Sequence, residues 1–330
     1  MARGVVRSPE ALASGQIVGS YRLVQRLGQG GMATTWLAEA TADGQRVVLK
    51  FPDVAQIGDP AMYERFRRET EIGRRVNHPS VPRCLEMRED WQRPYLVMEF
   101  VAGKLLSDVV SRRGALPVSE ATHLTEQLLE ALTHLHNHGI VHRDLKPENL
   151  VVSPEGQLRI IDFGLALLEG SQRVTWRGFS GLAGTPAYMA PEQIRGERGG
   201  PQADVCAAGA MLYEMLAGEP PYSGDNPLAI MYRAINEPLP PIRRNDLPPG
   251  LWHVLQRALH RDRAVRYRSA EDFLRDLRAP EEVAAPPMDK PGRSRRLPFG
   301  LGGWGPSYVV AIVACVIIIV VALVLVHARG

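Results

Sequence analysis

The chain has 330 residues, of which 45% are hydrophobic, so a substantial core is available and disorder throughout is excluded. Its 39 basic and 36 acidic residues give a formal net charge of only +3, and we therefore expect no nucleic-acid partner. The three cysteines, Cys84, Cys206 and Cys315, are far apart and form no CxxC pair, which disfavours a disulfide framework or a zinc site.

The first hundred residues are predicted to be rich in strands. Residues 1–20 have two arginines but no apolar segment, so we interpret them as an N-terminal tail and not as a secretory signal. From Tyr21, the stretches "YRLVQRLG", "TTWLAEA" and "QRVVLKF" have the composition of short strands. Asp59-Pro60 then begins an amphipathic helix, and "RCLEMRED" and "RPYLVMEF" return to strand character.

The chain then becomes mainly helical. Leu124, Leu128, Leu132 and Leu135 recur at helical spacing and give one apolar face that ends before Gly139. Residues 204–218, "DVCAAGAMLYEMLAG", are nearly all apolar and predict a buried helix. The sequence therefore predicts an α+β, bilobal domain over residues 21–278, with a strand-rich N-lobe (21–100) and a larger helical C-lobe (101–278).

A membrane anchor is predicted beyond this domain. Residues 279–307 are rich in Pro and Gly and indicate a linker. Residues 309–326 contain no charge and no helix breaker, and as a helix they would extend ~27 Å. We expect a single transmembrane helix at 308–326; the alternative is a buried core helix. More basic residues precede this span than follow it, which places the domain in the cytoplasm of a single-pass cell-membrane protein. The remaining tail, 327–330, is too short for an extracellular sensor.

Two features of the N-lobe are suited to phosphate binding. The stretch "LGQGGMA" contains Gly28, Gly30 and Gly31, and such a loop lets backbone N-H groups approach phosphate oxygens. A glycine hairpin without a ligand is the alternative interpretation. Lys50 lies on the third predicted strand and Glu69 on the following helix, where a carboxylate could orient a phosphate-binding ammonium or simply form a surface salt bridge.

The charged residues of a further stretch are suited to phosphoryl transfer. In "GIVHRDLKPENLVV", Asp144 could orient an attacking hydroxyl and Lys146 could neutralise a transferring phosphoryl group. Asn149 and the Asp162 of "IIDFG" could hold Mg²⁺ between phosphate oxygens. Taken alone, the charge run is also consistent with a solvated loop between two apolar elements.

These stretches resemble a known family. "LGQGGMA", "VVLK", "RRE", "HRDLKPEN", "DFG", "GTPAYMAPE" and "DVCAAG" resemble the motifs of bacterial eukaryotic-like (Hanks-type) Ser/Thr protein kinases, in the same order and spacing. The resemblance implies the kinase fold, ATP and Mg²⁺ (or Mn²⁺) as cofactors, and a Lys50–Glu69 pair. It implies further nucleotide-binding positions, behind a Met98 gatekeeper, at Leu27, Gly28, Gly30, Gly31, Thr35, Glu99 and Val101.

The resemblance also assigns residues of the C-lobe. It implies that Glu192 pairs with Arg266, that Asp204 braces the catalytic loop, and that Thr185 belongs to the segment on which a protein substrate lies. The candidate phosphorylation sites are Ser171, Thr175 and Ser180. The family often has a basic residue five positions after Asp162, but here that residue is Leu167, so we expect that phosphorylation of this loop is not obligatory. Ala33 and Thr35 also depart from the family pattern, and we expect them to tune nucleotide affinity.

The resulting expectation is a membrane-anchored, non-specific Ser/Thr protein kinase that transfers the γ-phosphate of ATP to proteins and to itself. Its expected partners are protein substrates, ATP and the membrane, with a second copy of the chain as a further candidate. A pseudokinase scaffold is one alternative, although Lys50, Asp144, Asn149 and Asp162 are all present. A kinase-like small-molecule phosphotransferase is the other, although it should lack "GTPAYMAPE".

Overall fold

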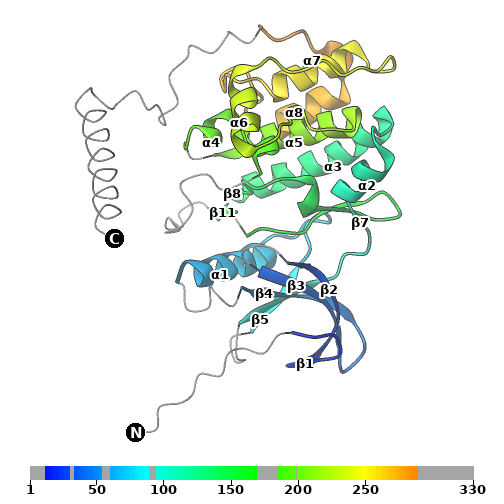
Figure 1. Cartoon of the computed structure of the whole chain (residues 1–330), viewed down its shortest axis with the longest axis vertical. Coiled ribbons are helices and arrows are strands. Elements are labelled where there is room, and N and C mark those ends of the chain that lie inside the picture. The colour runs from blue at the N-terminus through cyan, green and yellow to red at the C-terminus, as the bar shows by residue number, and fades with distance from the viewer. Residues whose placement is uncertain are drawn as a thin grey trace, which may run out of the picture. The chain divides into compact units, whose positions relative to one another are not determined.

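The computed structural model describes residues 12–29, 33–53, 60–88, 94–164, 166–168, 185–197 and 199–288 (Figure 1). Contacts divide the chain into a unit of residues 1–290 and a second unit of residues 291–330. The span expected at 308–326 and the tail at 327–330 lie outside the described residues. Among the residues that are described, no helix combines the length and the hydropathy needed to cross a membrane.

The N-lobe is built on one antiparallel sheet with the strand order β1-β2-β3-β4-β6-β5. Its strands are β1 (Ile17–Val18), β2 (Tyr21–Gln29), β3 (Ala33–Ala40), β4 (Arg46–Pro52), β5 (Cys84–Arg88) and β6 (Tyr95–Glu99). The five strands predicted from Tyr21 onward are confirmed, and β1 extends the sheet by pairing with the start of β2. Leu23, Ala38, Leu49 and Phe51 are fully buried beneath the sheet, because alternate residues of a strand face the same side.

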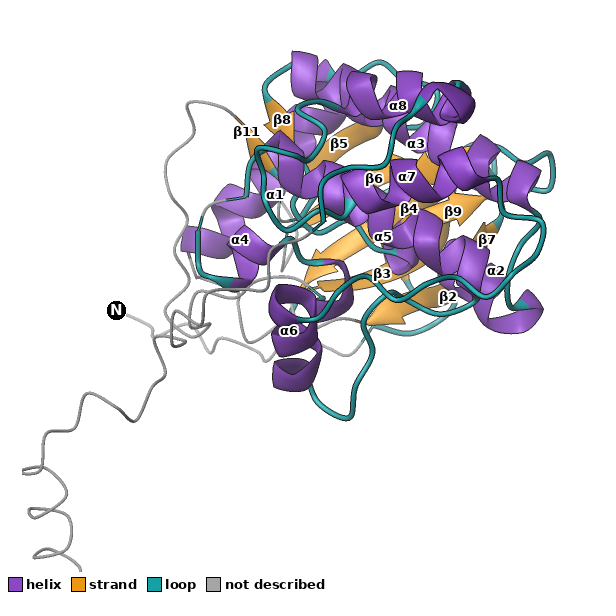
Figure 2. Cartoon of the chain, turned by 90° about the horizontal axis from the view of Figure 1, so that it is seen from above, coloured by secondary structure: helices purple, strands orange, loops and turns teal. Residues whose placement is uncertain are grey.

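One helix, α1 (Pro60–Arg75), accompanies this sheet and begins at the predicted proline. Of the described helices and strands, β5 is the one that α1 contacts most extensively. Viewed from above, α1 and α2 lie on opposite sides of the domain (Figure 2).

The C-lobe is mainly helical and lies at the other end of the domain from the six-stranded sheet (Figure 1). Its longer helices are α2 (Leu106–Arg113), α3 (Val118–Asn137), α5 (Pro201–Ala217), α6 (Pro227–Asn236), α7 (Pro249–Ala258) and α8 (Ala270–Arg278). Short elements complete it: β7 (Lys104–Leu105), β8 (Ile140–Val141), η2 (Pro147–Asn149), β9 (Leu150–Val152), β10 (Leu158–Ile160), β11 (Leu167–Leu168), η3 (Pro186–Tyr188), α4 (Pro191–Ile194) and η4 (Pro280–Glu282).

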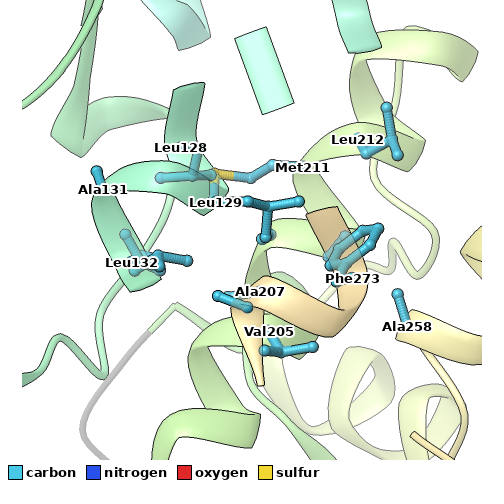
Figure 3. Packing of buried hydrophobic residues seen from close by; sticks show 14 of the residues in the cluster. Leu128, Leu129, Ala131, Leu132, Val205, Ala207, Met211, Leu212, Ala258 and Phe273 are labelled. Carbon is cyan, nitrogen blue, oxygen red and sulfur yellow. The ribbon is translucent and has the colours of Figure 1, made fainter. Parts of the chain in front are cut away.

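Helices α3 and α5 form the centre of the C-lobe core, as their apolar patterns predict. The leucine face of α3 packs against α5, which is buried on nearly all sides, and α7 and α8 close the core (Figure 3). The buried side chains include Leu128, Leu132, Val205, Met211, Ala258 and Phe273. This core provides a rigid base for the loop between β8 and β9, which contains the charge run.

The segment that follows α8 is docked on the C-lobe. We call residues 279–288 the strap. Val283 packs against the core, and His253 of α7 donates from Nδ1 to the Val283 carbonyl at 2.9 Å. His260 Nε2 contacts the Pro287 carbonyl at 3.1 Å. The docked structure therefore continues ten residues past position 278, into the segment interpreted from sequence as linker.

Candidate active site

Lys50 joins the two lobes through a pair of carboxylates. It lies on β4, and its Nζ is 2.8 and 2.9 Å from the two carboxylate oxygens of Glu69 on α1. The same Nζ is 2.7 Å from Oδ1 of Asp162, which follows β10. Glu69 is 3% exposed, whereas the Asp162 side chain is 42% exposed. One ammonium is thus held by a buried carboxylate of the N-lobe and an accessible carboxylate of the C-lobe.

This arrangement keeps the ammonium charged. Burial acts to lower the pKa of Lys50, but the charges of Asp162 and Glu69 outweigh it and raise that pKa. For Asp162, the loss of water on its partly covered side acts to raise the pKa, but the Lys50 charge outweighs this and the pKa is lowered. For Glu69, burial dominates and raises the pKa against the opposing charge of Lys50. The accessible Asp162 therefore keeps its negative charge where a cation could approach.

The loop after β8 places the other candidate catalytic side chains together. Asp144 and Lys146 lie 3.3 Å apart between Oδ2 and Nζ, and both side chains are partly accessible. Asn149 is buried, and its Nδ2 donates to the Asp144 carbonyl at 2.8 Å. The structure therefore fixes the loop from within and leaves the Asp144 carboxylate at its surface.

Asp204 at the start of α5 braces this loop, as the resemblance implies. Its buried carboxylate accepts the backbone N-H groups of His142 at 2.8 Å and Arg143 at 2.7 Å. It also contacts His136 Nε2 at 2.9 Å. Arg143 is the one residue other than glycine, among those described, that has a positive φ, at 69°. Such a conformation persists where the surrounding contacts enforce it, and here the two hydrogen bonds to Asp204 do so.

A hairpin brings Asn149 and Asp162 to the same end of one small sheet. β9 and β10 pair antiparallel with Leu150 opposite Ile160, and the Ile161 N-H donates to the Asn149 carbonyl at 2.9 Å. The Asn149 amide nitrogen is already bonded, which leaves its oxygen to act as a ligand. Oxygen donors of this kind, an amide and an ionised carboxylate, suit Mg²⁺. The two residues therefore fit the metal role expected from sequence.

The expected nucleotide-binding positions lie along the strands next to Lys50. Thr35 on β3 is paired with Gly28 on β2 and with Lys50 on β4. These three residues therefore lie side by side on adjacent strands. Leu27 is 47% exposed. Glu99 ends β6 and Val101 follows it, whereas Met98 is buried against Phe66 of α1. Gly30 and Gly31 lie outside the described residues.

The segment after "DFG" is described only in part. The candidate phosphorylation sites Ser171, Thr175 and Ser180 lie outside the described residues. Thr185 is described and precedes η3, where its carbonyl accepts the Tyr188 N-H at 3.0 Å. Glu192 and Arg266 form the expected pair, with both side chains buried and N–O distances of 2.8 and 3.1 Å.

The structure adds contacts that the sequence did not reveal. Tyr188 donates its hydroxyl to Glu214 of α5 at 2.8 Å, and burial raises the pKa of both groups. Arg68 of α1 donates to the Ala166 carbonyl at 3.3 Å. The available signals were weak, because each pair joins residues distant in sequence and either partner alone has the pattern of an ordinary surface or core residue.

Comparisons with known proteins agree with this geometry. The family model described as protein kinase domain matches residues 21–277. PknB of Mycolicibacterium smegmatis, a serine/threonine-protein kinase, is 36% identical over 278 residues, which are 82% of this chain and 44% of that protein. PknA of Mycobacterium tuberculosis, also a serine/threonine-protein kinase, is 36% identical over 285 residues, which are 84% of this chain and 65% of that protein. A probable serine/threonine-protein kinase PknB of Bifidobacterium longum is 35% identical over 280 residues, which are 82% of this chain and 40% of that protein. The chain thus spans only part of the length of each relative.

Proposed function

Because the chain belongs to the protein kinase family, we propose that it transfers the γ-phosphate of ATP to Ser and Thr hydroxyls of proteins, including its own. The observation that carries the proposal is the Lys50 ammonium, held at 2.7–2.9 Å by Glu69 and Asp162. This contact assembles both lobes around the place where phosphates would bind. The names of the relatives support Ser/Thr as the acceptor.

The chemistry follows from the positions of the side chains. Lys50 binds phosphate oxygens of ATP, and Glu69 holds its ammonium in place. Asp144 orients the acceptor hydroxyl and accepts its proton as the oxygen attacks the γ-phosphorus. The bond from that phosphorus to the β–γ bridging oxygen breaks, and ADP carries the electron pair away. Lys146, 3.3 Å from Asp144, stabilises the negative charge on the transferring group.

Asn149 and Asp162 would hold a divalent cation, Mg²⁺ or Mn²⁺, which neutralises charge on the phosphate oxygens. Leu27, Gly28 and Thr35 cover the nucleotide, and the backbone of Glu99 and Val101 receives the base. Thr185 contributes to the surface on which the protein substrate lies. Support for these roles comes from the places of Thr35 and Gly28 beside Lys50 on the sheet and of Glu99 at the end of β6.

The first prediction tests the activity itself. The chain of residues 1–330, incubated with ATP and Mg²⁺, transfers labelled phosphate to Ser or Thr of a basic acceptor protein and to itself. Lys50→Met removes the phosphate-binding ammonium and abolishes transfer. Asp144→Asn lowers the rate by ~10² to 10⁴, since it removes positioned general-base assistance. The measurement is incorporation of γ-phosphate, with the sites mapped by mass spectrometry. Undiminished transfer by Asp144→Asn would contradict the role of Asp144.

We also propose that the chain is anchored in the cell membrane by a helix at residues 308–326, with the kinase domain in the cytoplasm. Support comes from eighteen uncharged, mostly branched residues at 309–326 and from the excess of basic residues before them. Tethering would raise the effective concentration of the domain near other membrane proteins.

The second prediction tests the anchor. Deleting residues 306–330 moves the protein from the membrane fraction to the soluble fraction after cell fractionation, and it leaves the rate on a soluble peptide unchanged. A deleted protein that stays with the membranes would exclude this helix as the anchor. The matched control deletes residues 1–11, which has no effect on the distribution between the two fractions.

A further inference from the structure

Helix α1 contains a glycine in its last turn, at a position where the helix touches β5. Gly73 lies two residues before the end of the helix at Arg75 and four residues after Glu69. Glycine within a helix is less favourable than alanine, because its backbone loses more conformational freedom on folding. A glycine here therefore calls for a structural reason.

The reason is a close approach between two backbones. A Cβ atom at Gly73 would lie 2.5 Å from Cβ of Cys84, 2.9 Å from its backbone N and 3.3 Å from its Cα. Carbon atoms in contact are ordinarily separated by about 3.5–4.0 Å. The atoms of Cys84 cannot easily yield, since Cys84 is the first residue of β5 and is paired with Met98 on β6. An alanine at position 73 would therefore displace α1 from the sheet by about 1 Å.

The place of this contact connects it to the active site. Residues four apart lie on the same face of a helix, so Glu69 and Gly73 both face the sheet. Across the sheet, β5 pairs with β6, and β6 pairs with β4 so that Leu96 is opposite Lys50. The Gly73–Cys84 contact therefore sets how closely Glu69 can approach Lys50, at the observed 2.8 and 2.9 Å.

We propose that Gly73 is a positioning residue for phosphoryl transfer: its missing side chain lets α1 rest on the backbone of β5, which holds Glu69 against Lys50. This inference rests on the proposed kinase function. It assigns to Gly73 no contact with ATP, metal or protein substrate. The effect on the reaction is transmitted through the contact of Glu69 with Lys50, and this gives the inference its test.

The experiment uses the chain of residues 1–330 and measures steady-state phosphorylation of a peptide. Gly73→Ala lowers kcat by about 10²-fold, the size expected from a displacement of about 1 Å in a catalytic array. KM for the peptide is unchanged, because the peptide does not touch α1. The matched control is Gly209→Ala in α5, where an added Cβ would lie 2.9 Å from Cβ of Ala258. This variant suffers a similar steric conflict far from Lys50, so it unfolds at lower temperature but keeps the kcat of the wild type.

A double-mutant cycle with Glu69→Gln separates positioning from general damage to the fold. If Gly73 acts through Glu69, adding Gly73→Ala to Glu69→Gln lowers kcat no further. An undiminished kcat for Gly73→Ala, or an equal additional loss in the Glu69→Gln background, would overturn the inference.

A second variant keeps the test decisive if Gly73→Ala does not fold. Cys84→Leu enlarges the same contact from the side of the strand and lowers kcat in the same non-additive way, whereas Cys84→Ala removes only the sulfur and keeps the wild-type kcat. A Cys84→Leu protein with wild-type kcat would also overturn the inference.

The activity of the wild-type chain is measured first. A wild-type chain that transfers no phosphate contradicts the proposed function, whereas an active wild type with an equally active Gly73→Ala contradicts only the role of Gly73.

Discussion

Arg143 shows how one residue of the catalytic loop is held without a phosphate group. Its backbone N-H is bonded to Asp204, and its Nε donates to the Gly199 carbonyl at 3.1 Å. The guanidinium thus has an anchor within the C-lobe itself. In a kinase that depends on loop phosphorylation, a basic cluster that includes this arginine binds the phosphate, and the position that would add a second basic residue is Leu167.

The third prediction follows at the scale of this residue. Replacing Thr175 and Ser180 together by Ala lowers the rate of peptide phosphorylation by less than about tenfold, because Arg143 already has a protein partner. The comparison is Asp144→Asn, whose loss should be ~10² to 10⁴. Both are measured as initial rates under identical conditions, with Ser171→Ala as the control for a hydroxyl outside this pair. A loss from the double variant as deep as that of Asp144→Asn would show that loop phosphorylation is obligatory.

At the scale of elements, the longest and most periodic segments were the most predictable from sequence. The leucine face of α3, the apolar α5 and the proline at the start of α1 are each determined locally, and the structure confirms all three. β1 and β7 have two residues each and become strands only through pairing with β2 and β9. No local pattern identifies such strands, because the pairing partner supplies their stability.

The residues of the candidate site also fall into two groups, those that the sequence identifies locally and those whose role depends on packing. Its charged and amide side chains stand within short motifs, so the sequence alone identified the candidates Lys50, Glu69, Asp144, Asn149 and Asp162. The contributions of Gly73 and Tyr188 arise from contacts across the fold, with Cys84 and with Glu214. These contacts depend on how elements distant in sequence pack, which a single sequence does not specify.

The strap gives the fourth prediction, at the same scale. A fragment of residues 1–278 lacks Val283 and the two carbonyl groups that meet His253 and His260. Its free energy of unfolding should be about 2–4 kcal/mol lower than that of residues 1–288, the sum of a partly buried valine and two hydrogen bonds. Urea denaturation measures the difference. Val283→Ala should cost about 1 kcal/mol, whereas Met288→Ala, at a side chain that is 94% exposed, should cost nothing. Equal stability of the two fragments would contradict a structural role for the strap.

At the scale of the whole molecule, a buried ion pair ties together parts of the C-lobe that are far apart in sequence. Arg266 lies between α7 and α8, and its guanidinium meets Glu192 of α4 at 2.8 and 3.1 Å. It also donates to the carbonyl groups of Gln202 in α5 and of His260, each at 3.1 Å. Both charges are fully buried, so neither can be solvated by water if its partner is lost.

The fifth prediction concerns this pair. Arg266→Met leaves the Glu192 carboxylate buried, with only the longer contact to the half-exposed Arg263 side chain, and the free energy of unfolding falls by about 3–5 kcal/mol. Arg263 provides the control, because its Nε is 3.7 Å from the same carboxylate but its side chain is 44% exposed. Arg263→Met should therefore cost less than about 1 kcal/mol. Both values come from urea denaturation of residues 1–288, and equal losses would show that burial is not what makes the Arg266 contact strong.

The place where the strap leaves the domain has a consequence for how such chains diverge. The strap is docked at α7, at the end of the C-lobe away from the six-stranded sheet that contains Lys50 (Figure 1). Insertions, deletions or exchanges after residue 288 therefore do not alter the spacing of the groups around the transferred phosphate. Selection can act on the strap and on the groups around Lys50 separately, because the two lie at opposite ends of one folded unit.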